Sequence, residues 1–145
     1  MGKVLVFGVL FSSMAACGGG DAAKSPVSFK HDVIPIFKRS CSLGSSCHGL
    51  PNGQGGLLLN TSDPKKTHEA IVDVASGELP TMPYVTPGDA SKSFLMHKLD
   101  GTQAQFDAQC IDKSCKALMP LGSDGLEAAD KETLRRWIAD GALDN

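Results

Sequence analysis

Apolar residues at helical spacing open the part of the chain that we expect to fold. The repeat consists of Phe29, Val33, Ile36 and Phe37. A recurrence every three or four positions predicts one buried helical face, and Ser28 is placed to cap its start. Pro35 interrupts the pattern, so we expect a kinked helix or one shortened to its second half. The helix should end near Ser40.

The clearest pattern lies at the other end of the chain. Its apolar face consists of Leu126, Ala129, Thr133, Leu134, Trp137 and Ile138. Either Ser123 or Asp124 is placed to cap this helix, and Gly141 is placed to end it. A single amphipathic helix is therefore predicted just before the last few residues of the chain.

Two shorter helices are predicted between these two, over residues 63–74 and 91–101. Ser91 is placed to cap the second of them, and Gly101 is placed to close it. Stretches rich in Gly, Ser and Pro separate the helices, at residues 41–56, 77–88 and 102–122. No stretch alternates with a period of two for long enough to predict a sheet. We therefore predict an all-α domain with few helices and long loops.

The first residues have the layout of a secretory signal. A short basic start, an apolar run and two alanines lead to Cys17. We predict a signal peptide over residues 1–16, and hence export. The small residues before Cys17 look like a bacterial lipobox, which would acylate this cysteine and anchor the protein to a bacterial membrane, facing the periplasm or the cell exterior. The alternative is an ordinary signal peptide with an unmodified Cys17. Residues 17–26 are predicted to be a flexible tether, and residues 27–145 one domain.

The net charge argues against one class of partner, and the number of cysteines suggests how they are used. The net charge is −2 and no basic block occurs, which argues against a nucleic-acid partner. Five cysteines is an odd number for an exported protein. With Cys17 assigned to lipid, the others form two local pairs: Cys41 with Cys47, and Cys110 with Cys115. We predict that the second pair is a structural disulfide closing a tight loop.

The first cysteine pair has the residues needed to attach a haem. A c-type haem is held by two cysteines and by a histidine that directly follows the second one. Cys47 and His48 keep that order, but five residues rather than two separate Cys41 from Cys47. Residues 43–46 could loop outward, because Gly and Ser form turns easily and a longer loop costs little entropy. A buried haem would also explain the unusual loop content. The alternative is a Cys41–Cys47 disulfide with His48 incidental.

A second iron ligand should come from further along the chain. Met119 precedes Pro120 shortly before the last helix and is the main candidate, with Met82 and His97 as competitors. A thioether opposite an imidazole is the ligation of electron-transfer cytochromes. When the protein fills both axial positions, the iron has no open position for a substrate. This favours electron transfer over catalysis.

The order of these features resembles a class I-type cytochrome c domain, in particular the exported, often lipid-anchored cytochrome-like domains of environmental bacteria. The motifs that carry the resemblance are Val33-Ile34-Pro35-Ile36-Phe37, Gly55-Gly56-Leu57-x-Leu59, Pro87-Gly88-Asp89, and Ser93-Phe94-Leu95 with Lys98-Leu99. The resemblance covers essentially all of residues 27–145. It implies one haem between the loops, and a first and last helix in contact. The residues expected to meet there are Ile36 and Phe37 on one side and Leu134, Trp137 and Ile138 on the other.

The sequence therefore predicts an exported, lipid-anchored carrier of single electrons with one covalent haem c. Cys41 and Cys47 would bind the haem, and His48 and Met119 would be its iron ligands. The expected partners are redox proteins of the envelope, so the protein would be at most a subunit of a redox complex and no enzyme by itself. A haem-free, disulfide-bonded lipoprotein with a binding or structural role in the envelope is the alternative. A haem enzyme or gas sensor with an open iron face is a third hypothesis.

Overall fold

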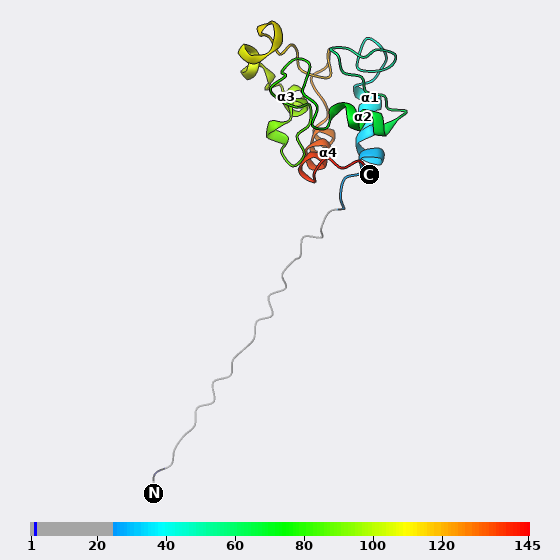
Figure 1. Ribbon diagram of the computed structural model, residues 1–145. Coiled ribbons are helices and arrows are strands. Elements are labelled where there is room, and N and C mark those ends of the chain that lie inside the picture. The colour runs from blue at the N-terminus through cyan, green and yellow to red at the C-terminus, as the bar shows by residue number, and fades with distance from the viewer. Residues whose placement is uncertain (1, 3–24) are drawn as a thin grey trace.

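A computed structural model describes Gly2 and residues 25–145 (Figure 1). Apart from Gly2, the predicted signal peptide (1–16) lies outside the described residues. The same holds for Cys17, the predicted lipid anchor, and for the tether as far as residue 24.

The described part of the chain is rich in helix and contains no β-strand, so the predicted all-α class is confirmed. The α-helices are α1 (Ile34–Ser40), α2 (Pro64–Ile71), α3 (Phe94–Asp100) and α4 (Ala128–Ala139). A π-helical turn, η1 (Phe29–Val33), precedes α1, and 3₁₀ turns occur at η2 (Ala90–Lys92), η3 (Gln103–Gln109) and η4 (Ile111–Lys113). None of the helices in this part of the chain is long and apolar enough to cross a membrane.

Pro35 shapes the first helical segment as predicted. The α-helix is restricted to the second half of the expected span and ends at Ser40, with Pro35 in its first turn. The first half is the π-helical turn η1, and the Ser28 hydroxyl accepts a 3.2 Å hydrogen bond from the His31 backbone N–H at its start. The cap predicted at Ser28 is therefore confirmed.

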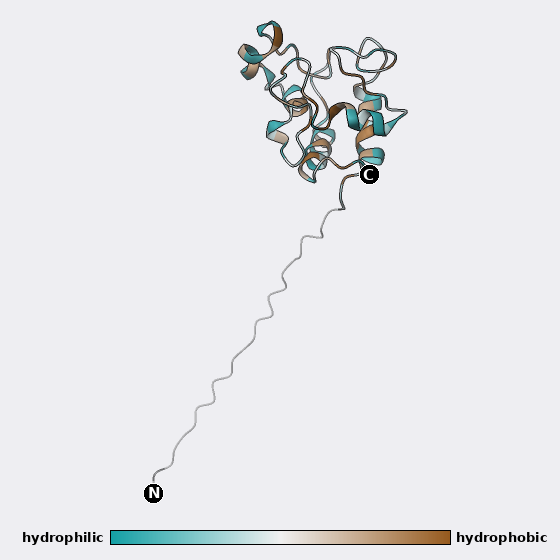
Figure 2. Cartoon of the chain, in the orientation of Figure 1, coloured by the Kyte–Doolittle hydropathy of each residue, from teal (hydrophilic) through white to brown (hydrophobic). Residues whose placement is uncertain are grey.

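The core lies where η1, α1, α2 and α4 meet, and Figure 2 shows hydrophobic stretches on these helices near one another. The Phe29 ring stacks on Trp137 with the ring centroids 5.0 Å apart, and the His68 ring meets Phe29 edge-on at 5.2 Å. The His68 Nε2 also bonds the carbonyl of Ala142 at 2.7 Å. The core further includes Ile36, Phe37, Leu134 and Ile138. The last helix therefore packs against the first helical segment, mainly through η1.

Some predicted helix boundaries were wrong. Helix α2 ends at Ile71, before the predicted end at residue 74, because Val72 turns into extended backbone and bridges Val85. Ser93, not Ser91, occupies the N-cap of α3, and the Ser91 hydroxyl instead bonds the Asp89 carboxylate. The closing residue of α3, Gly101 (φ 74°), is as predicted.

The N-terminal end of α4 also differs from the prediction. Glu127 occupies its N-cap without a side-chain hydrogen bond, and neither Ser123 nor Asp124 serves as the cap. The Ser123 hydroxyl accepts from the Gly125 N–H and donates to the Pro120 carbonyl, so it closes a turn before the helix. The segment 102–122, predicted to be loop throughout, contains the turns η3 and η4.

Candidate cofactor site

The chain between Cys41 and Cys47 loops outward. The His48 backbone N–H donates a 3.0 Å hydrogen bond to the Cys41 carbonyl, which closes the loop at its base. Leu43, near the tip, leaves 65% of its surface exposed. The five intervening residues therefore do not separate Cys41 from His48 in space.

Two glycines make this loop possible. Gly44 has a φ of +126°, a conformation that residues with a Cβ rarely adopt. Gly49 packs so tightly under the loop that a Cβ would lie 2.7 Å from the Ser42 carbonyl oxygen and 2.9 Å from the Gly44 nitrogen. Both are backbone atoms, which cannot rotate away. The glycine after His48 is thus needed for close approach.

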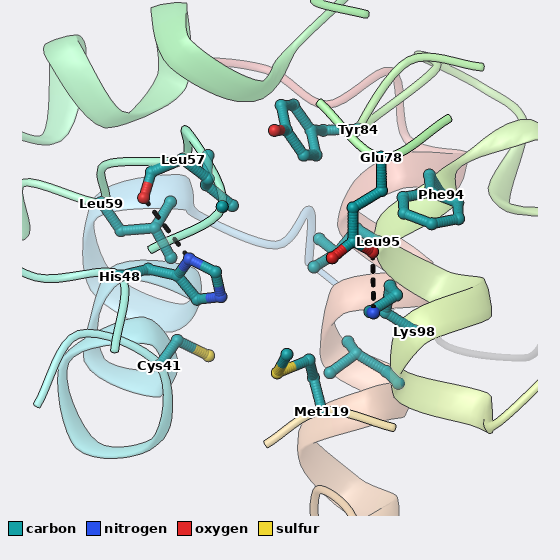
Figure 3. Close-up of a pocket in the computed structure, with 12 residues that line it drawn as sticks. Cys41, His48, Leu57, Leu59, Glu78, Tyr84, Phe94, Leu95, Lys98 and Met119 are labelled. Atoms are coloured by element: carbon teal, nitrogen blue, oxygen red, sulfur yellow. Dashed lines mark hydrogen bonds and ion pairs between the residues drawn. The ribbon is translucent and has the colours of Figure 1, made fainter. Parts of the chain in front are cut away.

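The His48 ring is oriented by backbone carbonyls. Its Nδ1 lies 3.0 Å from the carbonyl oxygen of Gln54 and 3.4 Å from that of Leu57. Because a carbonyl can only accept, Nδ1 carries a proton, and in the neutral imidazole the lone pair is therefore on the other ring nitrogen. Figure 3 shows this second nitrogen turned into a cleft. A backbone bond of this kind on one nitrogen is how proteins orient a histidine that ligates a metal through the other.

Met119 lies on the opposite wall of that cleft. Its backbone N–H donates a 2.9 Å hydrogen bond to the Lys98 carbonyl on α3, which fixes the chain before Pro120. Figure 3 shows the Met119 thioether pointing across the cleft toward the side chains of Cys41 and His48. The structure thus brings together an imidazole and a thioether that stand 71 positions apart in the sequence.

The competing iron ligands lie elsewhere. Both ring nitrogens of His97 are engaged, one with the Thr102 hydroxyl at 2.8 Å and the other with the Ser91 carbonyl at 2.9 Å. Met82 packs in a second, smaller apolar cluster. Neither side chain lines the cleft. Among the described methionines, only Met119 does so.

The cleft has an inner and an outer part. The outer part has a cavity volume of about 250 Å³, and the inner part is smaller, at about 70 Å³. The apolar and aromatic walls of the inner part include Leu57, Leu59, Tyr84, Phe94, Leu95 and Leu99. The outer part is continuous with it through Cys41, His48 and Met119, and is lined also by Cys47 and by the exposed Leu43 and Leu121. All four residues predicted to bind haem therefore line one cleft.

Cys41 and Cys47 are free thiols. Burial raises the pKa of the Cys41 thiol to about 12, and the neighbouring Cys47 adds to this effect, because two thiolates would repel each other. Cys41 is therefore a neutral thiol at physiological pH. The alternative disulfide between Cys41 and Cys47 is not formed in this structure.

Cys110 and Cys115 form the predicted disulfide, with an S–S distance of 1.91 Å. Both cysteines are buried in the second apolar cluster together with Leu79 and Phe94. Phe94 also lines the cleft, so the disulfide turn supports the wall that carries α3. The backbone N–H of Cys115 is bound by the Asp107 carboxylate at 2.7 Å.

A charged pair interrupts the apolar wall, and it was missed at the level of sequence. The Lys98 ammonium lies 2.9 Å from a Glu78 carboxylate oxygen, and both residues line the cleft (Figure 3). The burial of Lys98 could have been predicted from helical spacing, because Lys98 follows Phe94 by four positions and so shares the buried face of α3. No local pattern identified Glu78.

Comparison with known protein families, with curated proteins and with solved structures finds no match to this chain. In the part of the chain that the structure describes, no cluster of three or more His, Cys, Asp or Glu side chains is placed to hold a metal ion by itself.

Proposed function

We propose that the protein is an exported monohaem c-type cytochrome that carries single electrons in the bacterial envelope. One observation carries the proposal: His48 and Met119 face each other across an apolar cleft whose walls also present Cys41 and Cys47. The proposed fold is cytochrome c-like, with few helices and long loops packed around one haem. The loop geometry supports this despite the five-residue spacing, because Cys41 and His48 remain in backbone contact.

The residues that line the cleft have the side chains that would hold a c-type haem. The thiols of Cys41, in the inner cleft, and Cys47, in the outer cleft, would form the two thioethers. His48 would ligate the iron through the nitrogen that its carbonyl bonds leave free, and Met119 would supply a second protein ligand from the opposite wall. When bound, the haem supplies a centre that gains and loses one electron without making or breaking a protein bond.

The protein holds the two proposed iron ligands in place and surrounds them with largely apolar side chains. The carbonyls of Gln54 and Leu57 hold the His48 ring in one orientation, and the Lys98 carbonyl holds the backbone of Met119. The mainly apolar walls of the inner cleft offer water few hydrogen-bond partners, so little solvent should reorganise when the charge changes. With an imidazole and a thioether on its two sides, the site leaves no position for a substrate. These features favour electron transfer over catalysis, in a carrier or a subunit of a redox complex.

The proposed location is a bacterial membrane surface outside the cytoplasm, reached by the signal peptide and held by lipid on Cys17. The outer cleft, near Cys47, is the proposed site of electron exchange, since the exposed Leu43 and Leu121 border it and a docking partner can reach it. Partners would be redox proteins of the envelope that dock weakly and transiently. The absence of a basic block in the sequence speaks against nucleic acid as a partner.

The test is a reduced pyridine haemochrome spectrum of the protein purified from its native host. Extraction with acid acetone beforehand removes any haem that is not covalently attached. We expect a c-type α band on this polypeptide, which Cys47→Ser shifts or abolishes. The matched control is the double variant Cys110→Ser/Cys115→Ser, which alters the other cysteine pair and should keep the band.

A colourless wild-type protein from the native host would overturn the proposal. It would favour the haem-free, disulfide-bonded lipoprotein instead. Thiol labelling before and after reduction then distinguishes the two, because thioether sulfurs stay unreactive after reduction, whereas disulfide sulfurs are released.

A further inference from the structure

The Lys98–Glu78 pair lies in the wall of the cleft rather than on the outer surface of the protein. The side chain of Lys98 is only 9% exposed, and that of Glu78 is 26% exposed. Taking an ammonium out of water is costly unless partners replace the water. Lys98 has such partners: its Nζ lies 2.9 Å from Glu78, 2.7 Å from the Cys115 carbonyl oxygen and 5.8 Å from the centroid of the Phe94 ring.

Hydrogen bonds hold both the backbone and the charged ends of the pair. The Glu78 carbonyl accepts a 2.9 Å hydrogen bond from the Ile111 N–H, next to the disulfide turn. The Lys98 carbonyl accepts the N–H of Met119 at 2.9 Å, and Lys98 belongs to α3. These bonds fix the backbone at both residues, and the bonds from the Lys98 Nζ to Glu78 and to the Cys115 carbonyl hold the charged ends together. The pair is therefore a fixed electrostatic feature of the site.

A charge held in an apolar cleft acts on that cleft far more strongly than a charge in water, because little solvent screens it. One-electron reduction lowers the net charge inside the cleft by one. An ammonium nearby favours the reduced state, and a carboxylate favours the oxidised state. The two members of the pair therefore act on the redox equilibrium in opposite directions.

We propose that Lys98 and Glu78 set the reduction potential of the site, with Lys98 raising it and Glu78 lowering it. This inference rests on the proposed haem function. Both are positioning and tuning residues that need not touch the iron. We infer this because the charged pair lies in the same wall as Met119, and the other walls of the cleft are mainly apolar.

The test is a spectroelectrochemical titration of the full-length haem protein, with small redox mediators as the electron donors and acceptors. Lys98→Met removes the ammonium and keeps the length of the side chain, and Glu78→Gln removes the carboxylate and keeps its shape. The first variant should shift the potential downward, and the second should shift it upward. The double variant should lie between the two single variants.

A matched pair of the same residue types exists on the protein surface. Lys65 and Glu69 form an ion pair on α2 with side chains 69% and 57% exposed, and neither lines the cleft. Water and salt screen such charges. Lys65→Met and Glu69→Gln should therefore leave the potential unchanged within the error of the titration.

A shift in potential counts as an effect of charge only if Met119 still ligates the iron in the variant. Met119 is bound to the backbone carbonyl of Lys98, which Lys98→Met leaves in place. The charge-transfer band of methionine-ligated ferric haem should therefore persist in both cleft variants. With that band present, potentials that do not move, or that move in the same direction, overturn this inference alone. A wild-type protein without covalent haem overturns it together with the proposed function.

Discussion

The backbone N–H of His48 reaches back to the carbonyl of Cys41 with a 3.0 Å hydrogen bond, across a loop that contains Cys47. Two further bonds tighten the loop, since the N–H groups of Cys47 and Gly49 both donate to the Gly44 carbonyl, at 3.0 and 3.1 Å. Leu59 donates to the His48 carbonyl at 2.6 Å and ties the loop to the cleft wall. The position of His48 thus depends on a loop with almost no free space beneath it.

Gly49→Ala should therefore destabilise the protein and loosen His48. The added Cβ would lie 2.7 Å from the Ser42 carbonyl oxygen, so the backbone must shift. Overpacking of this kind costs about 1–3 kcal/mol in the free energy of unfolding. Urea denaturation followed by circular dichroism measures it. Ser45→Ala, at an exposed position of the same loop, should change stability by no more than about 0.5 kcal/mol. Equal effects of the two substitutions would mean that the loop can relax around a Cβ.

Met119→Leu should lower the reduction potential and open the iron to external ligands. Leucine keeps the apolar volume but supplies no thioether, and methionine ligation raises the potential of a haem. Carbon monoxide should then bind rapidly to the reduced variant, whereas the reduced wild type should bind it slowly. Met82→Leu is the matched control, because Met82 packs in the second apolar cluster and does not line the cleft. Rapid binding to the Met82 variant but not to the Met119 variant would reassign the ligand.

Local signals in the sequence predicted the parts of this fold that depend on local chemistry. Pro35 shortens α1 because its ring and missing N–H act within one turn of helix. The Cys110–Cys115 disulfide could be predicted because a separation of five residues lets the two side chains meet without help from the rest of the fold. Gly101 ends α3 for a similar reason, since its left-handed conformation is a property of the residue itself.

Features set by tertiary contacts could not be predicted in this way. The end of α2 depends on the bridge between Val72 and Val85, which are distant in sequence. The Glu78–Lys98 pair depends on how the disulfide turn packs against α3, since Lys98 also bonds the Cys115 carbonyl. The sequence offered several sulfur and nitrogen ligands for iron. Only the folded chain distinguishes Met119, which lines the cleft, from His97, whose two ring nitrogens are already engaged.

Loss of the disulfide should cost stability. Closing a loop of this length removes conformational entropy from the unfolded chain worth roughly 2 kcal/mol. The double variant Cys110→Ser/Cys115→Ser should therefore unfold at a lower urea concentration, and burial of two hydroxyls in an apolar cluster adds to the loss. Reduction of the wild type isolates the effect of the covalent link, because it keeps the sulfurs. An unchanged midpoint after verified reduction would show that the link contributes nothing.

The Cys41 thiol of haem-free folded protein should react very slowly with alkylating reagents at pH 8. The thiolate is the reactive form, and burial and the neighbouring Cys47 raise the pKa of Cys41 to about 12. At pH 8 only about one Cys41 in ten thousand would be ionised, against roughly a quarter of unperturbed cysteines with a pKa near 8.5.

The raised pKa of Cys41 also determines how folding stability and the alkylation rate change with pH. Because folding raises this pKa, the neutral thiol stabilises the folded state below about pH 9, and that stabilisation is lost as the pH rises toward 12. The alkylation rate should climb about tenfold per pH unit over the same range. Mass spectrometry of Cys47→Ser protein follows Cys41, although this variant also removes the Cys47 contribution to the pKa. Urea-unfolded protein is the control and should react at the rate of a free cysteine. Equally fast labelling of folded and unfolded protein would contradict the raised pKa of the half-buried Cys41.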